Sequence, residues 1–185
     1  MLAICAQSLQ LNGMKKVVIV GPECTGKSTL SEALARHYNT VWVPEYARGY
    51  LENLVMGYQQ TDLLSIARGQ LRLEEMWSAD ANRLLLCDTD LLVIKIWSQF
   101  KYGNCDPFIL NALNNSTRDL YLLTYVDIPW EEDPQREHPD KREELYQIYL
   151  KELKLGGTPF VEIKGSLAER ERRAVAAIDQ LLIPE

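Results

Sequence analysis

A single stretch near the amino end constrains most strongly what this chain can fold into. The apolar run VVIV is followed by GPECTGKS, in which residues 21–28 complete the phosphate-binding signature GxxxxGK[S/T]. A helical pattern starts inside the signature and continues over residues 27–38. The signature therefore lies between a strand and a helix, the setting in which such loops hold phosphate groups. This arrangement predicts an α/β domain that binds a nucleotide.

The residue types within this loop have separate physical roles. Gly21 and Gly26 allow tight turns, so that backbone N–H groups and the positive end of the following helix face the phosphates. We expect Lys27 to reach the β- and γ-phosphates of ATP, Ser28 to hold Mg²⁺, and Thr29 to assist near the α-phosphate. Three intervening residues complete the expected ATP-binding set: Glu23, Cys24 and Thr25. Cys24 is interpreted as a small loop residue, with a reactive thiol as the alternative.

The rest of the chain alternates between strand and helix patterns, which is typical of a parallel sheet with crossover helices. Five runs have strand character: VVIV, TVWV, LLLCD, LYLLTYV and PFVEIKG. A closing helix is predicted for residues 166–182, with Leu167, Ala174, Ile178 and Leu181 on one face. With 185 residues and 46% hydrophobic composition, we expect one three-layer domain over residues 14–185, preceded by an extension over residues 1–13.

Charge and cysteine usage limit the classes of partner. A net charge of −6 disfavours binding to a nucleic acid backbone. The start of the chain lacks a basic region and is too short to cross a bilayer, so no membrane partner is expected. The four cysteines show no CxxC pairing, and we expect reduced thiols in a cytoplasmic protein. Oligomeric state is left open.

A proline-broken, highly charged segment follows the fourth predicted strand. Residues 127–142, DIPWEEDPQREHPDKR, interrupt the regular alternation of elements. A solvated surface loop is the simpler interpretation. Because this position follows a strand of a phosphate-binding domain, we favour a lid that brings Arg136 and Arg142 to ATP.

Carboxylates follow the second and third predicted strands, where the sites of open parallel sheets assemble. Asp88 is placed to hold Mg²⁺, and Asp90 to contact the acceptor, although a helix N-cap is an equally good role for Asp90. Glu45 can accept the proton of an attacking hydroxyl, or can simply be an acidic residue at the start of a helix. Arg48 can bind the substrate or the transferred phosphoryl group, or pair with a surface carboxylate.

Other nucleotide-binding classes lack support. We find neither the NKxD element of GTPases nor the strand with an acidic pair that marks many motor ATPases. Several motifs instead resemble the ribosylnicotinamide kinase domain of the NadR-type bifunctional regulators of NAD biosynthesis. They are GPECTGKSTL, VPEYARGY, IARGQ, CDTD with the downstream WSQFKYG, and DIPWEEDPQREHPDKR.

The resemblance covers nearly the whole chain and implies a P-loop kinase fold with a five-stranded parallel sheet. It also implies transfer of phosphate from ATP to nicotinamide riboside, a small-molecule substrate, with Mg²⁺ as cofactor. Carried onto this chain, Lys27 and Ser28 serve ATP and Mg²⁺, Glu45 or an aspartate of CDTD handles the ribose hydroxyl, and Arg136 with Arg142 belongs to the lid. The adenylyltransferase domain of such regulators needs an HxGH signature, which this chain lacks.

Aromatic residues near these motifs suit the pyridinium cation of nicotinamide riboside. Trp97, Tyr102, Tyr46 and Tyr50 can offer ring faces to it, although Trp97 fits a helix core equally well. A kinase for another nucleoside or a nucleoside monophosphate remains an alternative, with Arg68 and Arg72 as candidates to bind a monophosphate. A regulatory module that senses ATP without transferring phosphate is a second alternative.

Overall fold

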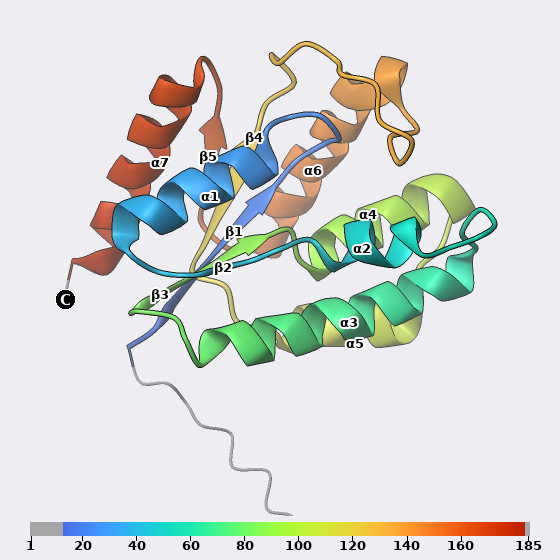
Figure 1. Ribbon diagram of the computed structural model, residues 1–185, viewed down its shortest axis with the longest axis horizontal. Helices are drawn as coiled ribbons and strands as arrows, with labels where there is room; N and C mark the ends of the chain where they lie inside the picture. The colour runs from blue at the N-terminus through green and yellow to red at the C-terminus, as the bar shows by residue number, and fades with distance from the viewer. Residues whose placement is uncertain (1–12, 184–185) are drawn as a thin grey trace, which may run out of the picture.

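The structure is a computed structural model that describes residues 13–183, and a parallel five-stranded sheet forms its centre (Figure 1). The strand order is β2-β3-β1-β4-β5, which confirms the predicted sheet. The strands are β1 (Lys15–Val20), β2 (Trp42–Val43), β3 (Leu84–Asp88), β4 (Leu120–Thr124) and β5 (Phe160–Ile163). The helices are α1 (Lys27–Tyr38), α2 (Tyr46–Glu52), α3 (Gln60–Ser78), α4 (Leu91–Tyr102), α5 (Pro107–Asn115), α6 (Arg142–Gly156) and α7 (Leu167–Leu182). A short 3₁₀ turn, Pro139–Lys141, precedes α6.

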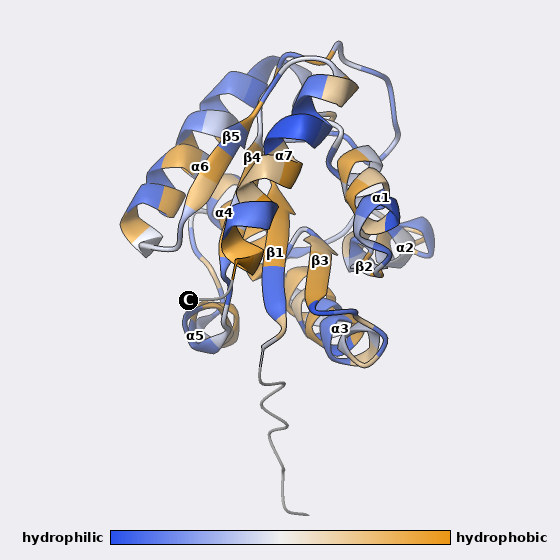
Figure 2. Cartoon of the chain, turned by 90° about the vertical axis from the view of Figure 1, so that its left-hand side faces the viewer, coloured by the Kyte–Doolittle hydropathy of each residue, from blue (hydrophilic) through white to orange (hydrophobic). Residues whose placement is uncertain are grey.

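Helices cover both faces of the sheet and make three layers. On one face, α1 and α7 pack against β1, β3 and β4 through residues such as Leu34 and Ile178. On the other face, α4 and α6 pack on the sheet through residues such as Ile96 and Tyr149. Apolar residues follow the strands in Figure 2, as strands buried on both faces require. A smaller apolar cluster joins α2, α3, α4 and α5 beside this core.

The strand order determines which loops meet. β1 lies between β3 and β4, and all three run parallel. Their carboxyl ends therefore bring together the phosphate loop after β1, the CDTD turn after β3 and the charged segment after β4. β2, next to β3, adds Glu45 at the same edge. The predicted extension, apart from Gly13, lies outside the described residues.

The closing helix differs from its prediction at its first turn. Ala174 and Ile178 are fully buried, as predicted, but Leu167 is 45% exposed. The buried position in the first turn belongs to Arg170, which is 2% exposed. The buried side chain in the first turn of α7 is thus the hydrogen-bonded guanidinium of Arg170, not Leu167 as the apolar periodicity predicts.

Ser166 caps this helix and gives a simple stability test. A reciprocal capping box links Ser166 to Glu169, and the Ser166 N–H donates to Glu169 Oε2 at 2.8 Å. We expect Ser166→Ala to lower the free energy of unfolding by about 1 kcal/mol, because the backbone N–H of Glu169 loses the Ser166 side chain as its acceptor. Urea unfolding without nucleotide measures the change. Ser78→Ala, at the last residue of α3, is the control, and an equal loss there would contradict a capping effect.

Candidate functional site

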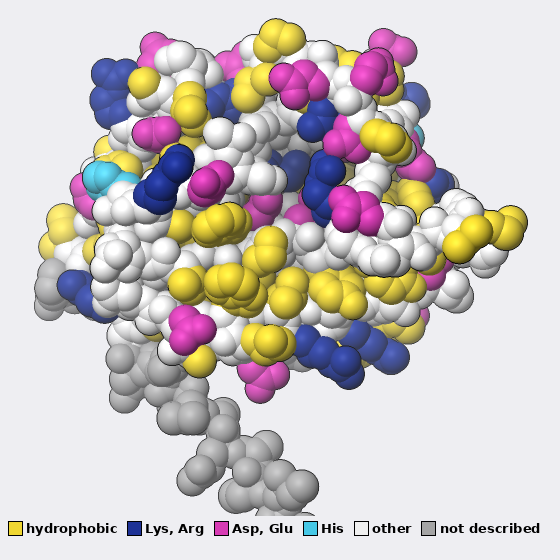
Figure 3. All heavy atoms as spheres, in the orientation of Figure 1, with side chains coloured by type: hydrophobic (Ala, Val, Ile, Leu, Met, Phe, Trp, Pro, Cys, Tyr) yellow, Lys and Arg dark blue, Asp and Glu magenta, His cyan; other side chains and the backbone are white. Residues whose placement is uncertain are grey.

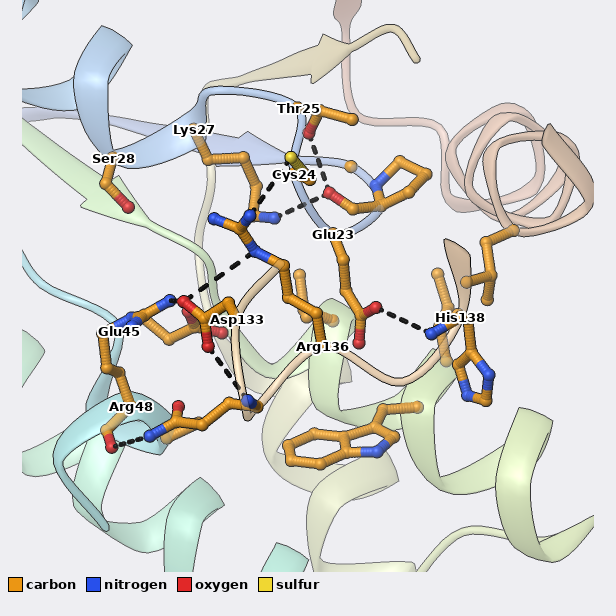
Figure 4. A pocket seen from close by; sticks show the side chains of 18 of the residues that line it. Glu23, Cys24, Thr25, Lys27, Ser28, Glu45, Arg48, Asp133, Arg136 and His138 are labelled. Carbon is orange, nitrogen blue, oxygen red and sulfur yellow. Dashed lines mark hydrogen bonds and ion pairs between the residues drawn. The ribbon is translucent and has the colours of Figure 1, made fainter. Parts of the chain in front are cut away.

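A cavity of about 500 Å³ opens at the carboxyl edge of the sheet (Figure 4). Its wall combines the phosphate loop, the start of α2, one side of α4, the charged segment after β4 and the first turns of α6. Around the opening, acidic and basic side chains alternate (Figure 3). The lining residues are Gly21, Pro22, Glu23, Cys24, Thr25, Gly26, Lys27, Ser28, Thr29, Glu45, Ala47, Arg48, Leu51, Val93, Ile96, Trp97, Phe100, Asp133, Gln135, Arg136, His138, Leu145 and Tyr149.

The phosphate loop is shaped by close contact with β4. A Cβ atom on Gly21, at φ 147°, would lie 2.3 Å from Thr124 Oγ1, so only glycine fits there. Thr25 is buried, and its hydroxyl donates to the Pro22 carbonyl at 2.8 Å and pairs with Thr124 Oγ1 at 2.7 Å. Lys27 Nζ donates to the same Pro22 carbonyl at 2.9 Å. The Thr25 side chain therefore shapes the loop, while the Lys27 amine lies across it.

Glu45 lines the cavity and does not cap its helix through its side chain. It occupies the N-cap position of α2, yet its side chain makes no capping hydrogen bond. Burial raises the pKa of Glu45 above that of an ordinary glutamate, and the nearby Asp88 carboxylate adds to this effect although the Lys27 charge opposes it. A carboxylate without a structural partner and with a raised pKa is suited to accept a proton.

Asp88, the last residue of β3, does not line the cavity itself but lies close to Lys27 and Ser28, which do. It is 2% exposed, and burial raises its pKa while Lys27 and Ser28 act in the opposite direction. Its Oδ1 atom is buried without a hydrogen-bond partner among the described residues. Carboxylate and hydroxyl oxygens suit Mg²⁺, and an unpartnered buried oxygen fits a metal ligand. The described part of the chain has no group of three His, Cys, Asp or Glu residues able to hold a metal. Mg²⁺ would therefore need phosphate oxygens and water as further ligands.

The expectation that Asp90 contacts the acceptor is corrected by the structure. Asp90 is 1% exposed and does not line the cavity. Its Oδ1 accepts the Leu92 N–H at 2.9 Å and caps α4, and its Oδ2 accepts hydrogen bonds from Arg118 Nε at 2.5 Å and Tyr121 Oη at 2.9 Å. Both oxygens are thus occupied by structural partners, which supports the N-cap alternative.

Among the predicted aromatic residues, only Trp97 lines the cavity, and its Nε1 donates to Tyr58 Oη at 2.6 Å. All four predicted aromatic residues pack against the apolar cluster beside α3, and Tyr46, Tyr50 and Tyr102 do not line the cavity. A Cβ atom on Gly69 would lie 2.1 Å from the Tyr46 ring, which shows how closely Tyr46 packs against α3. This packing does not support the predicted contacts of Tyr46 and Tyr102 with the acceptor.

The charged segment lies against the phosphate loop (Figure 4). Arg136 Nη1 donates to Cys24 Sγ at 3.3 Å, and Arg142 Nη1 donates to the Cys24 carbonyl at 3.2 Å. Arg48 Nη2 donates to Asp133 Oδ2 at 2.9 Å, so the segment also contacts α2. These bonds join the segment to two walls of the cavity, which a freely solvated loop would not do.

Sequence reasoning missed a second cavity of about 380 Å³ on the far side of the phosphate loop. Gly26 and Thr29 line it, together with residues 127–129 and residues 165–167 after β5. Arg170 also lines this cavity, and its guanidinium donates hydrogen bonds to the carbonyls of Thr25 at 2.9 Å and Gly165 at 2.8 Å. The sequence did carry one signal for a buried Arg170, namely its i, i+4, i+8 spacing with Ala174 and Ile178, which places all three residues on one face of α7.

Other site residues were also missed. Phe100 and Tyr149 add rings to the main cavity from α4 and α6. Arg68 and Arg72, the candidates for a monophosphate, are exposed and do not line the cavity, and Arg68 lies over the Phe108 ring at 5.1 Å. Among residues 13–183, no helix is long and apolar enough to cross a membrane.

Comparisons with known proteins agree with this geometry. A profile of the AAA domain family (AAA_28) matches residues 16–170. The chain is 28% identical to the trifunctional NAD biosynthesis/regulator protein NadR of Salmonella typhimurium, and 27% identical to that of Escherichia coli K12, each over 157 residues. The alignments cover 82% of this chain but 38% of each relative, so the chain spans well under half of their length. The resemblance to NadR-type proteins is thereby confirmed.

Solved structures share the fold. A crystal structure of NadR in complex with NR superposes with a TM-score of 0.79 at 23% identity, covering 94% of this chain and 53% of that one. Thymidylate kinase from Ehrlichia chaffeensis superposes with a TM-score of 0.64 at 15% identity, covering 90% and 99%. The architecture is therefore that of P-loop kinases.

Proposed function

The chain belongs to the AAA domain family, and from this premise we propose that it is an ATP-dependent kinase that phosphorylates the ribose 5′-hydroxyl of nicotinamide riboside. One observation carries the proposal: Glu45, free of any capping bond, shares a cavity with the phosphate loop. The similarity to NadR proteins, one of which was solved with NR, supports the acceptor.

In the proposed reaction, the 5′-hydroxyl oxygen attacks the γ-phosphorus of ATP while Glu45 accepts its proton. A bond forms between the ribose oxygen and phosphorus, and the bond to the β–γ bridging oxygen breaks, leaving ADP. Lys27 and the loop N–H groups hold the phosphates as charge shifts toward the β-phosphate. Ser28 and Asp88 would hold Mg²⁺, which neutralises phosphate charge when bound.

The chemistry of the main cavity favours a cationic, planar acceptor. Glu23, Glu45 and Asp133 place three carboxylates on its wall, of which Asp133 is paired with Arg48. Trp97, Phe100 and Tyr149 place aromatic rings there. Carboxylates attract the positive charge of the pyridinium ring, and aromatic faces add to that attraction. Arg48 and Arg136 are the arginines on the wall.

We assign the adenine of ATP to the second cavity. It adjoins Gly26 and Thr29, where the phosphate loop passes into α1, and its wall includes Ile128 and Leu167. The phosphates on the loop would then lie between the adenine and the acceptor. A position between the two cavities is what transfer from one ligand to the other requires.

A panel of acceptors tests the proposal. Purified protein with Mg-ATP is mixed with nicotinamide riboside, common nucleosides or nucleoside monophosphates, and ADP release is measured. We expect release with nicotinamide riboside above the rate without acceptor. Release with another nucleoside or a monophosphate alone would indicate a different kinase, and ATP binding without acceptor-dependent release would indicate a sensing module.

Residues 127–142 are proposed as a lid that closes over ATP, with Arg136 at the phosphates. We expect Arg136→Ala to lower kcat by about tenfold with a smaller effect on ATP affinity, because a charge-assisted hydrogen bond strengthens as phosphoryl charge moves. Kinetics combined with calorimetric ATP titration measure both quantities. Normal turnover, together with unchanged amide exchange over residues 131–142 on binding a nonhydrolysable ATP analogue, would make the segment a plain surface loop.

We also propose a cytoplasmic location. The described cysteines, Cys24, Cys87 and Cys105, are all free thiols, which fits a reducing compartment. A small molecule is the proposed partner, and nucleic acid and membrane are not.

A further inference from the structure

Glu23 has an unusual role for a residue in the middle of a phosphate loop. Its Oε2 atom accepts the backbone N–H of Glu137 at 3.0 Å and that of His138 at 3.1 Å (Figure 4 shows the bond to His138). The donors lie 114 and 115 residues further along the chain, in the proposed lid. One carboxylate thus joins the loop that holds phosphate to the segment above it.

A carboxylate at this place needs a physical reason. The phosphate loop binds anions through its N–H groups and Lys27, and a negative charge within it repels ATP. Two N–H donors partly neutralise the charge of Glu23 but do not remove it. A neutral residue would therefore suit phosphate binding better, and the benefit of Glu23 must lie in the bonds that its carboxylate makes.

Those bonds fix the backbone beside the lid arginine. Glu137 and His138 directly follow Arg136, whose guanidinium donates to Cys24 Sγ at 3.3 Å. The side chain of Glu137 is held from the other direction, because it accepts hydrogen bonds from Tyr58 Oη at 2.7 Å and Lys101 Nζ at 2.9 Å. The residues after Arg136 are thus bound to the phosphate loop through their backbone N–H groups and, through the Glu137 side chain, to Tyr58 and to Lys101 of α4.

We propose that Glu23 is a positioning residue that anchors the lid to the phosphate loop and so holds Arg136 where the transferred phosphoryl group lies. The anchor itself rests on hydrogen bonds within the chain. Its kinetic consequence rests on the proposed kinase function.

Amide exchange tests the anchor without any substrate. Glu23→Ala removes the acceptor, whereas Glu23→Gln keeps an oxygen that can accept both N–H groups but loses the charge. We expect exchange at residues 137 and 138 to accelerate by about tenfold in Glu23→Ala and to stay near the wild-type rate in Glu23→Gln. Glu131→Gln removes the same charge from an exposed lid side chain and should leave exchange unchanged. Unchanged exchange in Glu23→Ala, or equal acceleration in the control, would overturn the anchor.

Kinetics separate positioning from damage to the loop. Because Glu23→Ala frees the lid and also removes a charge that repels ATP, we expect kcat to fall by about tenfold while ATP affinity stays equal or rises. Glu23→Gln should recover most of kcat. A parallel loss of kcat and ATP affinity in both variants would mean that Glu23 only shapes the loop. If wild-type protein transfers no phosphate to any acceptor, the proposed function fails, while the exchange experiment still decides the anchor.

Discussion

Replacing Lys27 with alanine is expected to lower turnover by about 10²-fold or more. The Lys27 amine is the point charge nearest to where the β- and γ-phosphates would lie, and no other lysine lines the cavity. Its only hydrogen bond among the described residues is to the Pro22 carbonyl at 2.9 Å, so the substitution should leave the fold intact. Acceptor-dependent ADP release measures the loss, and circular dichroism with thermal unfolding checks the fold.

Lys151→Ala is a suitable control for this variant. Lys151 is exposed on α6, away from the cavity, and its removal changes the net charge by the same amount. Normal turnover is expected for the control. A folded Lys27→Ala protein with near-normal turnover would contradict the assignment of the phosphate loop.

Glu45→Gln should lower turnover by about 10²- to 10⁴-fold, and added Mg²⁺ should not restore it, because glutamine cannot accept the hydroxyl proton. Asp88→Asn should also lower turnover, but excess Mg²⁺ should recover part of it, because a weakened metal site can be filled by mass action. Titration of each variant with Mg²⁺ distinguishes the two roles. Rescue of Glu45→Gln alone would reverse the assignments.

The raised pKa of Glu45 gives this experiment a pH signature. A base acts only when it is ionised, so turnover should fall as the pH drops through the pKa of Glu45. Since burial raises that pKa, the fall should begin at a higher pH than it would for an ordinary glutamate. In Glu45→Gln this acid limb should be lost from the residual rate.

The sheet was predictable because its signals are local and redundant. Strands buried on both faces need nearly continuous apolar runs, and the phosphate signature identifies the first strand and helix together. The helix expected over residues 27–38 is observed with those bounds as α1. Arg170 in α7 was not predicted, because its partners, including Thr25 and Tyr125, are remote in sequence.

The roles of two carboxylates show where local reasoning stopped. Glu45 and Asp90 each follow a strand and precede a helix, and each is found at an N-cap. Only Asp90 bonds to its helix, and it is further held by Arg118 and Tyr121, which are 28 and 31 residues away. The difference between a site residue and a structural one thus depends on distant partners.

The aromatic residues followed the same rule. Nearness to a motif in sequence suggested Tyr46 and Tyr102, but the facing direction of a side chain depends on helix packing. Tyr46 turns toward Gly69 of α3, where the absent side chain leaves room for its ring. Tyr149 lines the cavity from α6, a helix outside the motifs on which the sequence analysis relied.

The buried Arg170 guanidinium has a consequence for how the chain is made. It bonds to the carbonyls of Thr25 and Tyr125 and pairs with Asp127, and it lies 145 residues after Thr25. During synthesis the phosphate loop leaves the ribosome long before this arginine exists, so a nascent chain would carry the loop sequence without its final support. The ability to bind a nucleotide should therefore appear late in translation, when α7 emerges. Truncated chains that end before Arg170 should not bind ATP.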